Sequence, residues 1–293
     1  MKYLPADKGF LGLCDPDAGM AEKARGLIIP FGLEKTVCYE SGTAKGPQAI
    51  LNASPELEYF DEVFWCEAFR YYGIATLEEP IIAPKLEDAL DQLEKLVENA
   101  LKAGHFPLVL GGEHSLSAGS IRPFARTHEQ LTILHFDAHA DLRDGFEGEH
   151  YSHAAAMRRC LDHDNVRIVS VGIRNISAEE LPFLDNNKSR IDIYWAKDKN
   201  RWDFLQIAQS VGSGAVYISF DLDGFDSSLM PATGTPEPGG LFWQETMDIL
   251  AAVSARSTIV GADIVELAPR PGLHACDFLA AKLVYKILSY ALL

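Results

Sequence analysis

The sequence has few cysteines, and their spacing excludes two common uses of this residue. There are five, and none of them belongs to a C-x-x-C pair. Neither a disulfide framework nor a thiolate zinc site is indicated by scattered cysteines of odd number. The pattern is typical of a protein kept in a reducing compartment, and we expect this one in the cytoplasm.

Long apolar runs are also missing. No stretch approaches the roughly 18 uninterrupted apolar residues that a membrane-spanning helix needs. The first residues, MKYLPADKGF, contain no apolar core of the signal-peptide type. We therefore expect no membrane as a partner.

Basic residues are scarce relative to acidic ones. The 26 Lys and Arg residues against 42 Asp and Glu residues give a formal net charge of −16. Such a charge argues against nucleic acid as a partner and is compatible with a cationic ligand, although solubility alone explains it equally well.

What the sequence does contain is an alternation of strand and helix patterns, without a repeat or linker that would divide residues 1–293. Short runs rich in β-branched residues predict strands at 106–110, 131–136, 166–171, 215–220 and 258–265. Periodic apolar residues predict helices at 86–104, 151–163, 240–255 and 276–291. Alternating strands and helices predict one α/β domain whose mostly parallel sheet is covered on both faces.

Polar clusters follow four of these predicted strands directly. They are Gly-Gly-Glu-His-Ser at 111–115, Asp-Ala-His-Ala-Asp at 137–141, Asp-Leu-Asp-Gly-Phe-Asp at 221–226, and Glu266. In open α/β sheets, ligands bind at the carboxyl ends of the strands. We therefore expect the four clusters to meet in one crevice, although they are far apart in the sequence.

The residue types in these clusters predict a metal centre. The candidate ligands are His114, Asp137, His139, Asp141, Asp221 and Asp223, whereas Asp226 is interpreted as a turn or cap residue. Alone, His114 is more often a helix-start or core histidine, and Asp221-Leu-Asp223 are more often loop or cap carboxylates. The Asp-x-His-x-Asp stretch is more suggestive but short, and the joint occurrence of all the pieces favours metal ligation. Four ionised aspartates in one crevice repel each other unless cations balance them, and two divalent ions balance four charges. Oxygen and imidazole ligands without thiolate favour Mn²⁺, with Zn²⁺, Co²⁺, Ni²⁺ and Fe²⁺ left open.

Three of these stretches closely resemble the signature motifs of the ureohydrolase family, which includes arginase and agmatinase. They are GGEHS at 111–115, FDAHAD at 136–141 and SFDLDGFDSSLMPATGTPEPGG at 219–240, and the stretch at 29–50 is also similar. The resemblance covers nearly the whole chain. It implies a three-layer α/β/α fold, two Mn²⁺ ions per subunit, and hydrolysis of a guanidino group to urea and an amine. It also implies a homo-oligomer, a trimer or a hexamer.

The resemblance assigns roles to individual residues. One ion would be held by His114, Asp137, Asp141 and Asp221, and the other by Asp137, His139, Asp221 and Asp223. Asp141 would also hydrogen-bond the hydroxide shared by the ions. His153 matches the histidine that passes a proton to the leaving amine. Glu266 matches the carboxylate that binds the guanidinium, and Thr235 a threonine of the active-site loop.

The substrate is predicted from motifs that differ between arginases and agmatinases. Arg174-Asn175-Ile176-Ser177 lacks the acidic pair of the arginase loop Arg-Asp-Val-Asp, so an α-ammonium group would lose its carboxylate partners. The stretches DLRD at 141–144 and PEPGGL at 236–241 resemble agmatinases instead. The predicted reaction is hydrolysis of agmatine, a small cation, to putrescine and urea.

Several alternatives stay open at this stage. Arg143 offers a partner for a carboxylate, so guanidinobutyrate remains a candidate substrate, together with guanidine and arginine. A metal-dependent amide deacetylase of the same fold and a non-catalytic metal-binding subunit are weaker alternatives. Ser227 stands where the family usually has proline, which affects the turn after Asp226 but no predicted ligand.

Overall fold

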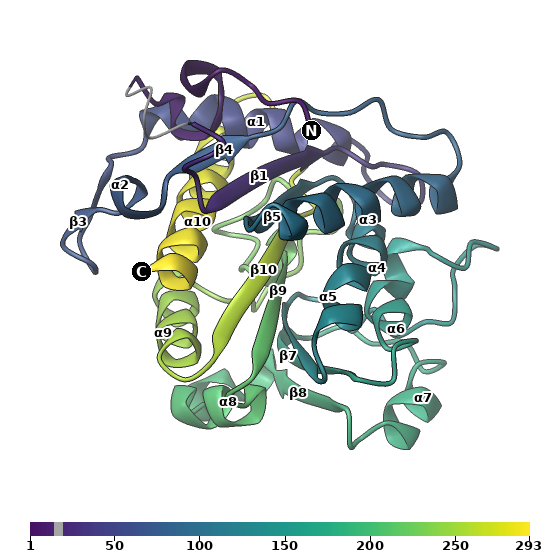
Figure 1. The fold of residues 1–293 in the computed structure, drawn as a ribbon. Coiled ribbons are helices and arrows are strands. Elements are labelled where there is room, and N and C mark those ends of the chain that lie inside the picture. The colour runs from purple at the N-terminus through teal and green to yellow at the C-terminus, as the bar shows by residue number, and fades with distance from the viewer. Residues whose placement is uncertain (15–19) are drawn as a thin grey trace.

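A parallel sheet of eight strands runs through the centre of the computed structural model, which describes residues 1–14 and 20–293 (Figure 1). The strand order is β4-β1-β5-β10-β9-β6-β7-β8. The strands are β1 (Gly26–Phe31), β4 (Ile74–Thr76), β5 (Phe106–Gly111), β6 (Leu131–Phe136), β7 (Val166–Ile173), β8 (Ile191–Trp195), β9 (Ala215–Asp221) and β10 (Thr258–Val265). A separate two-stranded hairpin consists of β2 (Phe60–Asp61) and β3 (Cys66–Glu67).

Helices cover both faces of the sheet, as Figure 1 shows. One face is covered by α3 (Leu86–Lys102), α4 (Ser117–Ser120), α5 (Arg122–Thr127), α6 (Ala156–Cys160) and α7 (Leu181–Asn186). The other is covered by α1 (Gly46–Ala53), α8 (Phe204–Val211), α9 (Trp243–Ser254) and α10 (His274–Leu292), with the single turn α2 (Phe69–Tyr72) at its margin. The predicted three-layer α/β/α architecture with a parallel sheet is confirmed.

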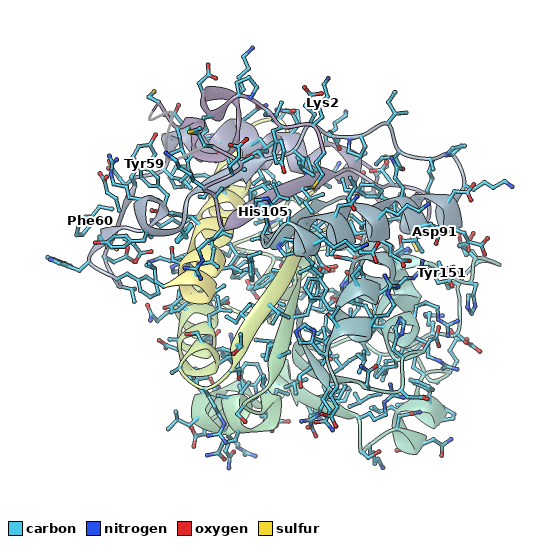
Figure 2. All side chains as sticks on the ribbon, viewed as in Figure 1. Lys2, Tyr59, Phe60, Asp91, His105 and Tyr151 are labelled. Carbon is cyan, nitrogen blue, oxygen red and sulfur yellow. The ribbon has the colours of Figure 1, made fainter. Side chains whose placement is uncertain are left out.

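Burial on both faces explains why the strands read as continuous apolar runs. In β1, Leu27, Ile29 and Phe31 pack with the α3 side, whereas Ile28 packs with the α10 side. Every residue of β1, β5 and β6 is buried. A parallel sheet between two helix layers leaves no solvent face, so the alternation of polar and apolar residues disappears. Side chains fill the space between the layers (Figure 2).

The helix predicted at 86–104 is confirmed by α3. Its stripe of Leu86, Leu90, Leu93 and Val97 is buried against the sheet. The helix ends at Lys102, and Gly104 adopts a φ of +81°, which glycine tolerates because it has no Cβ. This turn directs the chain into β5.

The helix predicted at 151–163 is wrong in length. Only the short 3₁₀ turn η6 (His153–Ala155) and α6 are helical there. The backbone N–H of Tyr151 is bonded to the Glu149 side chain and that of His153 to the Thr36 hydroxyl, so neighbouring loops hold this segment. Predicted helices at 240–255 and 276–291 correspond to α9 and α10, and strands β1, β4 and β8 were not predicted.

Two glycines let loops approach each other closely at the carboxyl end of the sheet. A Cβ at Gly112 would lie 2.0 Å from the carbonyl oxygen of Leu33. A Cβ at Gly224 would lie 2.9 Å from the backbone nitrogen of Asp137. Side chains at these positions would push apart the loops that follow β1, β5, β6 and β9.

The cysteines and the helices bear on two of the expectations from the sequence. All five cysteines lie in the described part of the chain, and all are free thiols. Within residues 1–14 and 20–293, no helix combines the length and apolarity needed to span a bilayer.

Candidate metal centre and active site

The four polar clusters lie next to each other because their strands are neighbours in the sheet. The order β5-β10-β9-β6 occupies its centre. Leu110 is paired with Ile264, Val265 with Asp221, and Phe220 with Phe136, so the four strands end at almost the same level. The expected crevice at the carboxyl ends of the strands is therefore formed.

His114 is the most deeply placed of the predicted ligands. It begins the 3₁₀ turn η5 (His114–Leu116) directly after β5, and it is 1% exposed. Its Nδ1 atom lies 3.1 Å from Asp137 Oδ2, 3.0 Å from Asp141 Oδ2 and 3.4 Å from Asp221 Oδ2. Despite these three carboxylates, this nitrogen makes no hydrogen bond of acceptable geometry to any described residue. A buried nitrogen that points into three carboxylates has the surroundings of a metal ligand.

A second group of ligands adjoins the first and shares Asp137. His139 Nδ1 lies 3.1 Å from Asp223 Oδ2 and 3.5 Å from Asp137 Oδ1. The ligand atoms of Asp137, His139 and Asp223 all lie within 4.8 Å of one another. The six predicted ligands therefore form two adjoining oxygen- and nitrogen-rich groups, which fits divalent transition ions.

The charges of this cluster require cations, either protons or metals. Burial would lower the pKa of His139, but Asp223 and Asp137 override it and raise the pKa to about 12. Burial, together with the charges of Asp223 and Asp137, raises the pKa of Asp221 well above its usual value. The pKa of His114 is likewise raised despite burial, because Asp137, Asp141 and Asp221 face it. Two divalent ions would supply the compensation that protons otherwise provide.

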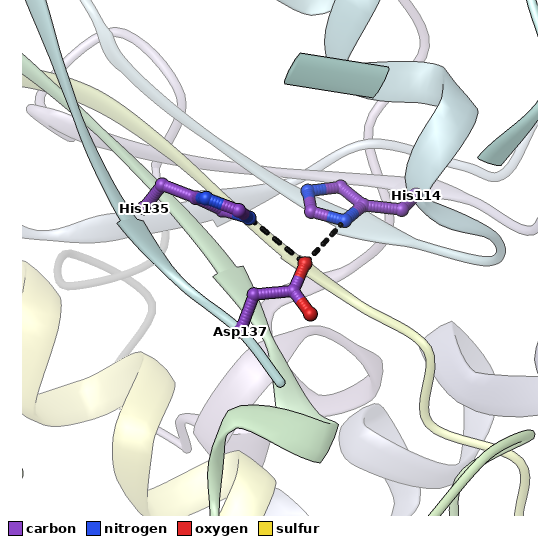
Figure 3. A group of neighbouring side chains, drawn as sticks. All are labelled: His114, His135 and Asp137. Atoms are coloured by element: carbon purple, nitrogen blue, oxygen red, sulfur yellow. Dashed lines mark hydrogen bonds and ion pairs between the residues drawn. The ribbon is translucent and has the colours of Figure 1, made fainter. Parts of the chain in front are cut away.

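His135 is a residue of this region that the sequence did not single out. Figure 3 shows its ring and that of His114 on either side of the Asp137 carboxylate. Its Nε2 lies 2.8 Å from Asp137 Oδ2, and its Nδ1 lies 2.9 Å from the Ser170 hydroxyl. Both ring nitrogens are thus engaged, so His135 orients Asp137 rather than joining the ligands. The sequence signal that could have indicated His135 is an ionisable residue inside an otherwise apolar predicted strand.

A buried polar network lies behind His114. Its Nε2 lies 2.9 Å from the Ser219 hydroxyl, which donates to Asp263 Oδ1 at 2.8 Å. Ser117 and Tyr217 donate to Asp263 Oδ2. Because the single Ser219 proton goes to Asp263, Ser219 accepts from His114 Nε2–H, and Nδ1 is left as the ligand nitrogen.

Two site residues have a left-handed backbone. Asp141 has a φ of +52° and Glu266 a φ of +66°, and neither is glycine. Such conformations are costly for residues with a Cβ and are concentrated at functional sites. Glu266 Oε1 accepts a hydrogen bond of 2.7 Å from the backbone N–H of His114, and burial raises the pKa of Glu266 to about 8.

Five of the six predicted metal ligands and Glu266 line one cavity of about 340 Å³. The sixth ligand, Asp137, is fully buried, with its Oδ2 3.1 Å from His114 Nδ1. Thr235 lies at the wall of the cavity and donates to Asp223 Oδ2 at 3.3 Å. His153 lines the same cavity from η6. Two cavity residues that the sequence did not single out, Tyr39 and Glu40, lie with Cys38 on the loop after β1. The structure thus brings together every residue that the sequence proposed for the site.

Arg143 is not available as a free partner for a carboxylate. Its guanidinium pairs with Glu179 and lies 4.7 Å from the centre of the Phe146 ring. Asn175 and Ser177 line the cavity, so the loop that replaces the arginase acidic pair does face the site. An anionic substrate end would have to compete with Glu179 for Arg143.

Asp226 shapes the loop after β9, in agreement with its interpretation as a turn residue. Its Oδ1 accepts from the Ser228 N–H, and its Oδ2 accepts from the N–H groups of Gly239 and Gly240. The backbone N–H of Ser227 donates to Glu237 O at 3.3 Å, a bond that the proline usual at this position could not form.

Replacing Asp226 by asparagine should destabilise the protein in a pH-dependent way. Hydrogen bonds from Ser228, despite the opposing effect of burial, lower the pKa of Asp226 to about 2. A lowered carboxyl pKa contributes stability above its unfolded value, and this contribution is lost as the pH falls towards 2. We expect Asp226→Asn to cost about 1 kcal/mol at pH 6 after discounting for solvent screening. Urea unfolding at pH 6 and pH 3 tests this, since an equal cost at both pH values would contradict the assignment.

Comparison with known proteins assigns the chain to a family. A sequence model described as the Arginase family matches residues 24–289. An N(1)-aminopropylagmatine ureohydrolase of Synechocystis is 35% identical over 90% of this chain and 88% of its own length. An agmatinase of Bacillus anthracis is 33% identical over 85% of each chain. The crystal structure of agmatine ureohydrolase of Thermoplasma volcanium superimposes with a TM-score of 0.85 at 28% identity, covering 97% of this chain and 94% of the other.

These matches run through the sheet, both helix layers and all four polar clusters. The arginase family consists of binuclear metal enzymes that hydrolyse C–N bonds of small guanidino compounds, and the His/Asp groups at the strand ends fit that chemistry. The protein therefore belongs to the arginase family of ureohydrolases.

Proposed function

We propose that this protein hydrolyses agmatine to putrescine and urea with two Mn²⁺ ions. The observation that carries the proposal is that Glu266 and five of the six His and Asp ligands line one cavity of about 340 Å³, with the sixth, Asp137, in contact with His114. Such a cavity combines a carboxylate for a guanidinium with a cluster that binds cations. A guanidinium keeps its charge at neutral pH and pairs with a carboxylate through its planar fork.

In this proposal, His114, Asp137, Asp141 and Asp221 hold one ion, and Asp137, His139, Asp221 and Asp223 hold the other. The observed approach of His114 Nδ1 to three carboxylates supports the first set, and the grouping of Asp137, His139 and Asp223 supports the second. When bound, a pair of divalent ions lowers the pKa of a water molecule and so provides hydroxide near neutral pH.

The remaining residues bind the substrate and move protons. Glu266 binds the guanidinium and orients its carbon towards the ligands. Asp141 accepts a hydrogen bond from the attacking oxygen. His153 gives a proton to the leaving amine, since imidazole is the side chain most often used as a general acid. Thr235 fixes Asp223 through its hydroxyl, as their contact of 3.3 Å supports.

The surroundings of Arg143 favour an amine over an acid at the far end of the substrate. Arg143 is paired with Glu179 and contacts Phe146, while Glu40 is a carboxylate that lines the same cavity. Glu40 itself lies 3.1 Å from Arg270 and is exposed. An ammonium group is compatible with the Glu40 carboxylate, whereas the carboxylate of guanidinobutyrate would have to compete with Glu179 for Arg143.

A second candidate substrate is N(1)-aminopropylagmatine, which carries an additional amine. Three relatives that are 35% identical to this chain are named N(1)-aminopropylagmatine ureohydrolase. Tyr39, Glu40 and Phe146 also line the cavity, and the Glu40 carboxylate is compatible with a longer polycation. This substrate would yield urea and a triamine.

The test is a urea assay on the Mn²⁺-reconstituted protein with agmatine, N(1)-aminopropylagmatine, guanidinobutyrate, guanidine and arginine. We expect agmatine to give the highest kcat/KM. A higher value for the aminopropyl compound would transfer the assignment to it. Preference for arginine or guanidinobutyrate would contradict both candidates, and hydrolysis of acetylpolyamines without urea would indicate a deacetylase. Full metal loading without hydrolysis of any compound would indicate a binding subunit.

Mn²⁺ should also stabilise the folded protein. An ion that binds only the folded state adds about 2.7 kcal/mol when its free concentration is roughly 100 times Kd. Metal-free protein should therefore gain thermal stability on addition of Mn²⁺, as differential scanning calorimetry can measure. Ca²⁺ is the control, because it prefers oxygen ligands to imidazole. A midpoint that Mn²⁺ leaves unchanged would contradict the metal assignment.

We further propose a cytoplasmic homo-oligomer, either a trimer or a hexamer. Five free thiols are compatible with a reducing compartment. Light scattering coupled to size-exclusion chromatography measures the assembly, and a monomer at micromolar concentration would contradict this part of the proposal.

A further inference from the structure

The ring of His153 contacts two residues of the loop that follows β1. Its Nδ1 lies 3.1 Å from the Thr36 hydroxyl oxygen, and its Nε2 lies 3.1 Å from the Cys38 sulfur. The Ser152 hydroxyl lies further from Nδ1, at 3.4 Å. The proposed function gives a role to His153 but none to Thr36 or Cys38.

The direction of the hydrogen bond between Thr36 and His153 follows from counting protons. The Thr36 hydroxyl donates its only proton to Glu113 Oε1 at 3.0 Å. Its oxygen also accepts from the backbone N–H of His153 at 3.0 Å. Because the hydroxyl has no second proton, it must accept from His153 Nδ1–H. The neutral ring therefore carries its proton on Nδ1, and the lone pair is on Nε2.

Glu113 holds this arrangement in place. It is fully buried, and its Oε2 accepts from the N–H groups of Lys35 and Thr36 at 2.5 and 2.6 Å. Its Oε1 accepts from Ser115 as well as from Thr36. Glu113 directly precedes His114, so the chain segment that presents a metal ligand also orients Thr36.

The Cys38 thiol completes the surroundings of the ring. Burial and the charges of Glu147 and Glu266 raise the pKa of this thiol, which therefore keeps its proton. A protonated thiol donates to a nitrogen lone pair. Cys38, which lines the cavity with His153, thus contacts Nε2, consistent with a lone pair on that nitrogen.

We propose that Thr36, held by Glu113, is a positioning residue that keeps His153 in the Nδ1–H tautomer with Nε2 facing the substrate. Nε2 is then the atom that takes up a proton from solvent, forming the imidazolium, and gives that proton to the leaving amine. Cys38 is its hydrogen-bond partner when substrate is absent. This inference rests on the proposed role of His153 as proton donor.

The test compares Thr36→Val with Thr36→Ser in the Mn²⁺-loaded protein. Valine removes the hydroxyl at nearly constant volume, whereas serine keeps it. We expect kcat of Thr36→Val for agmatine to fall about 10- to 100-fold, with unchanged KM and metal content. This is at most the lower limit of the roughly 10²- to 10⁴-fold that general acid catalysis contributes, because the ring is misoriented and not removed. Thr36→Ser should restore kcat to within about threefold of the original protein. Thr258→Val, at the opposite end of the sheet, is the matched control and should behave like the unmodified protein.

His153→Asn separates the two levels of the proposal. Full turnover by His153→Asn would remove this residue from the reaction, and the positioning role of Thr36 would fall with it. A strong loss in His153→Asn without a loss in Thr36→Val would overturn the positioning role alone. A loss in Thr36→Val that also changes KM or metal content, or that serine does not restore, would likewise overturn it. The double variant should be no slower than His153→Asn, because both changes act on one group.

Discussion

Replacing Asp137 by asparagine should lower kcat/KM for urea release by about 10⁴-fold or more, which corresponds to at least roughly 5.5 kcal/mol of transition-state stabilisation. Asp137 is fully buried and belongs to both ligand groups. Asparagine has the same shape but removes the negative charge. Its amide nitrogen would also confront the Nε2–H of His135, which now donates to Asp137 Oδ2 at 2.8 Å.

Metal content and urea release should be measured together for this variant. We expect both ions to be lost or weakly held, because Asp137 is the ligand that the two groups share. Asp164→Asn is a matched control, since Asp164 is exposed and precedes β7 at the amino end of the sheet. Two ions per subunit with near-normal turnover in Asp137→Asn would contradict the proposed centre.

Glu266→Gln is expected to have the second largest effect while leaving the metals bound. The glutamine carbonyl can still accept the hydrogen bond that Glu266 Oε1 receives from His114 N–H. Its NH2 group, which replaces the second carboxylate oxygen, cannot accept from a guanidinium, because both are donors. Removing one such charge-stabilising group costs about 10²- to 10³-fold in rate, or roughly 2.7–4 kcal/mol. We expect kcat/KM for agmatine to fall by this amount.

The matched control for charge is Glu129→Gln, because Glu129 is exposed and precedes β6 at the far end of the sheet. It should leave kcat/KM unchanged within error. Loss of metal from Glu266→Gln would show that the residue acts through His114 rather than on the substrate. Unchanged kcat/KM with both ions present would remove Glu266 from substrate binding.

The meeting of the polar clusters was predictable from the sequence because a parallel sheet places all its carboxyl ends on one side. Each cluster begins within a few residues of the end of a recognisable strand. Predicting the strand was therefore enough to place the cluster at the carboxyl end of the sheet. The order of the strands was not predictable, since apolar runs such as those of β5 and β9 do not reveal their neighbours. The structure supplies that order, and it makes β5, β10, β9 and β6 adjacent.

Other features could not be found from local patterns. Thr36 and Glu113 matter because of contacts across 77 residues of sequence. His135 and Asp263 lie inside strands that read as apolar, and their partners Ser170 and Ser219 belong to neighbouring strands. The 151–163 segment has helical periodicity, but bonds from Thr36 and Glu149 replace the first helical turn. In each case a distant partner decides the local structure.

The strand order has a consequence for local unfolding of the sheet. Spontaneous opening of a sheet begins at its margins, where the outermost strands have a neighbour on one side only, and proceeds inward. β4 and β8 occupy those margins, whereas the residues assigned to chemistry extend from the four innermost strands. Amide protons of β5, β10, β9 and β6 should therefore exchange with solvent last. The metal ligands at the ends of these strands should remain in place when the edge strands unfold locally.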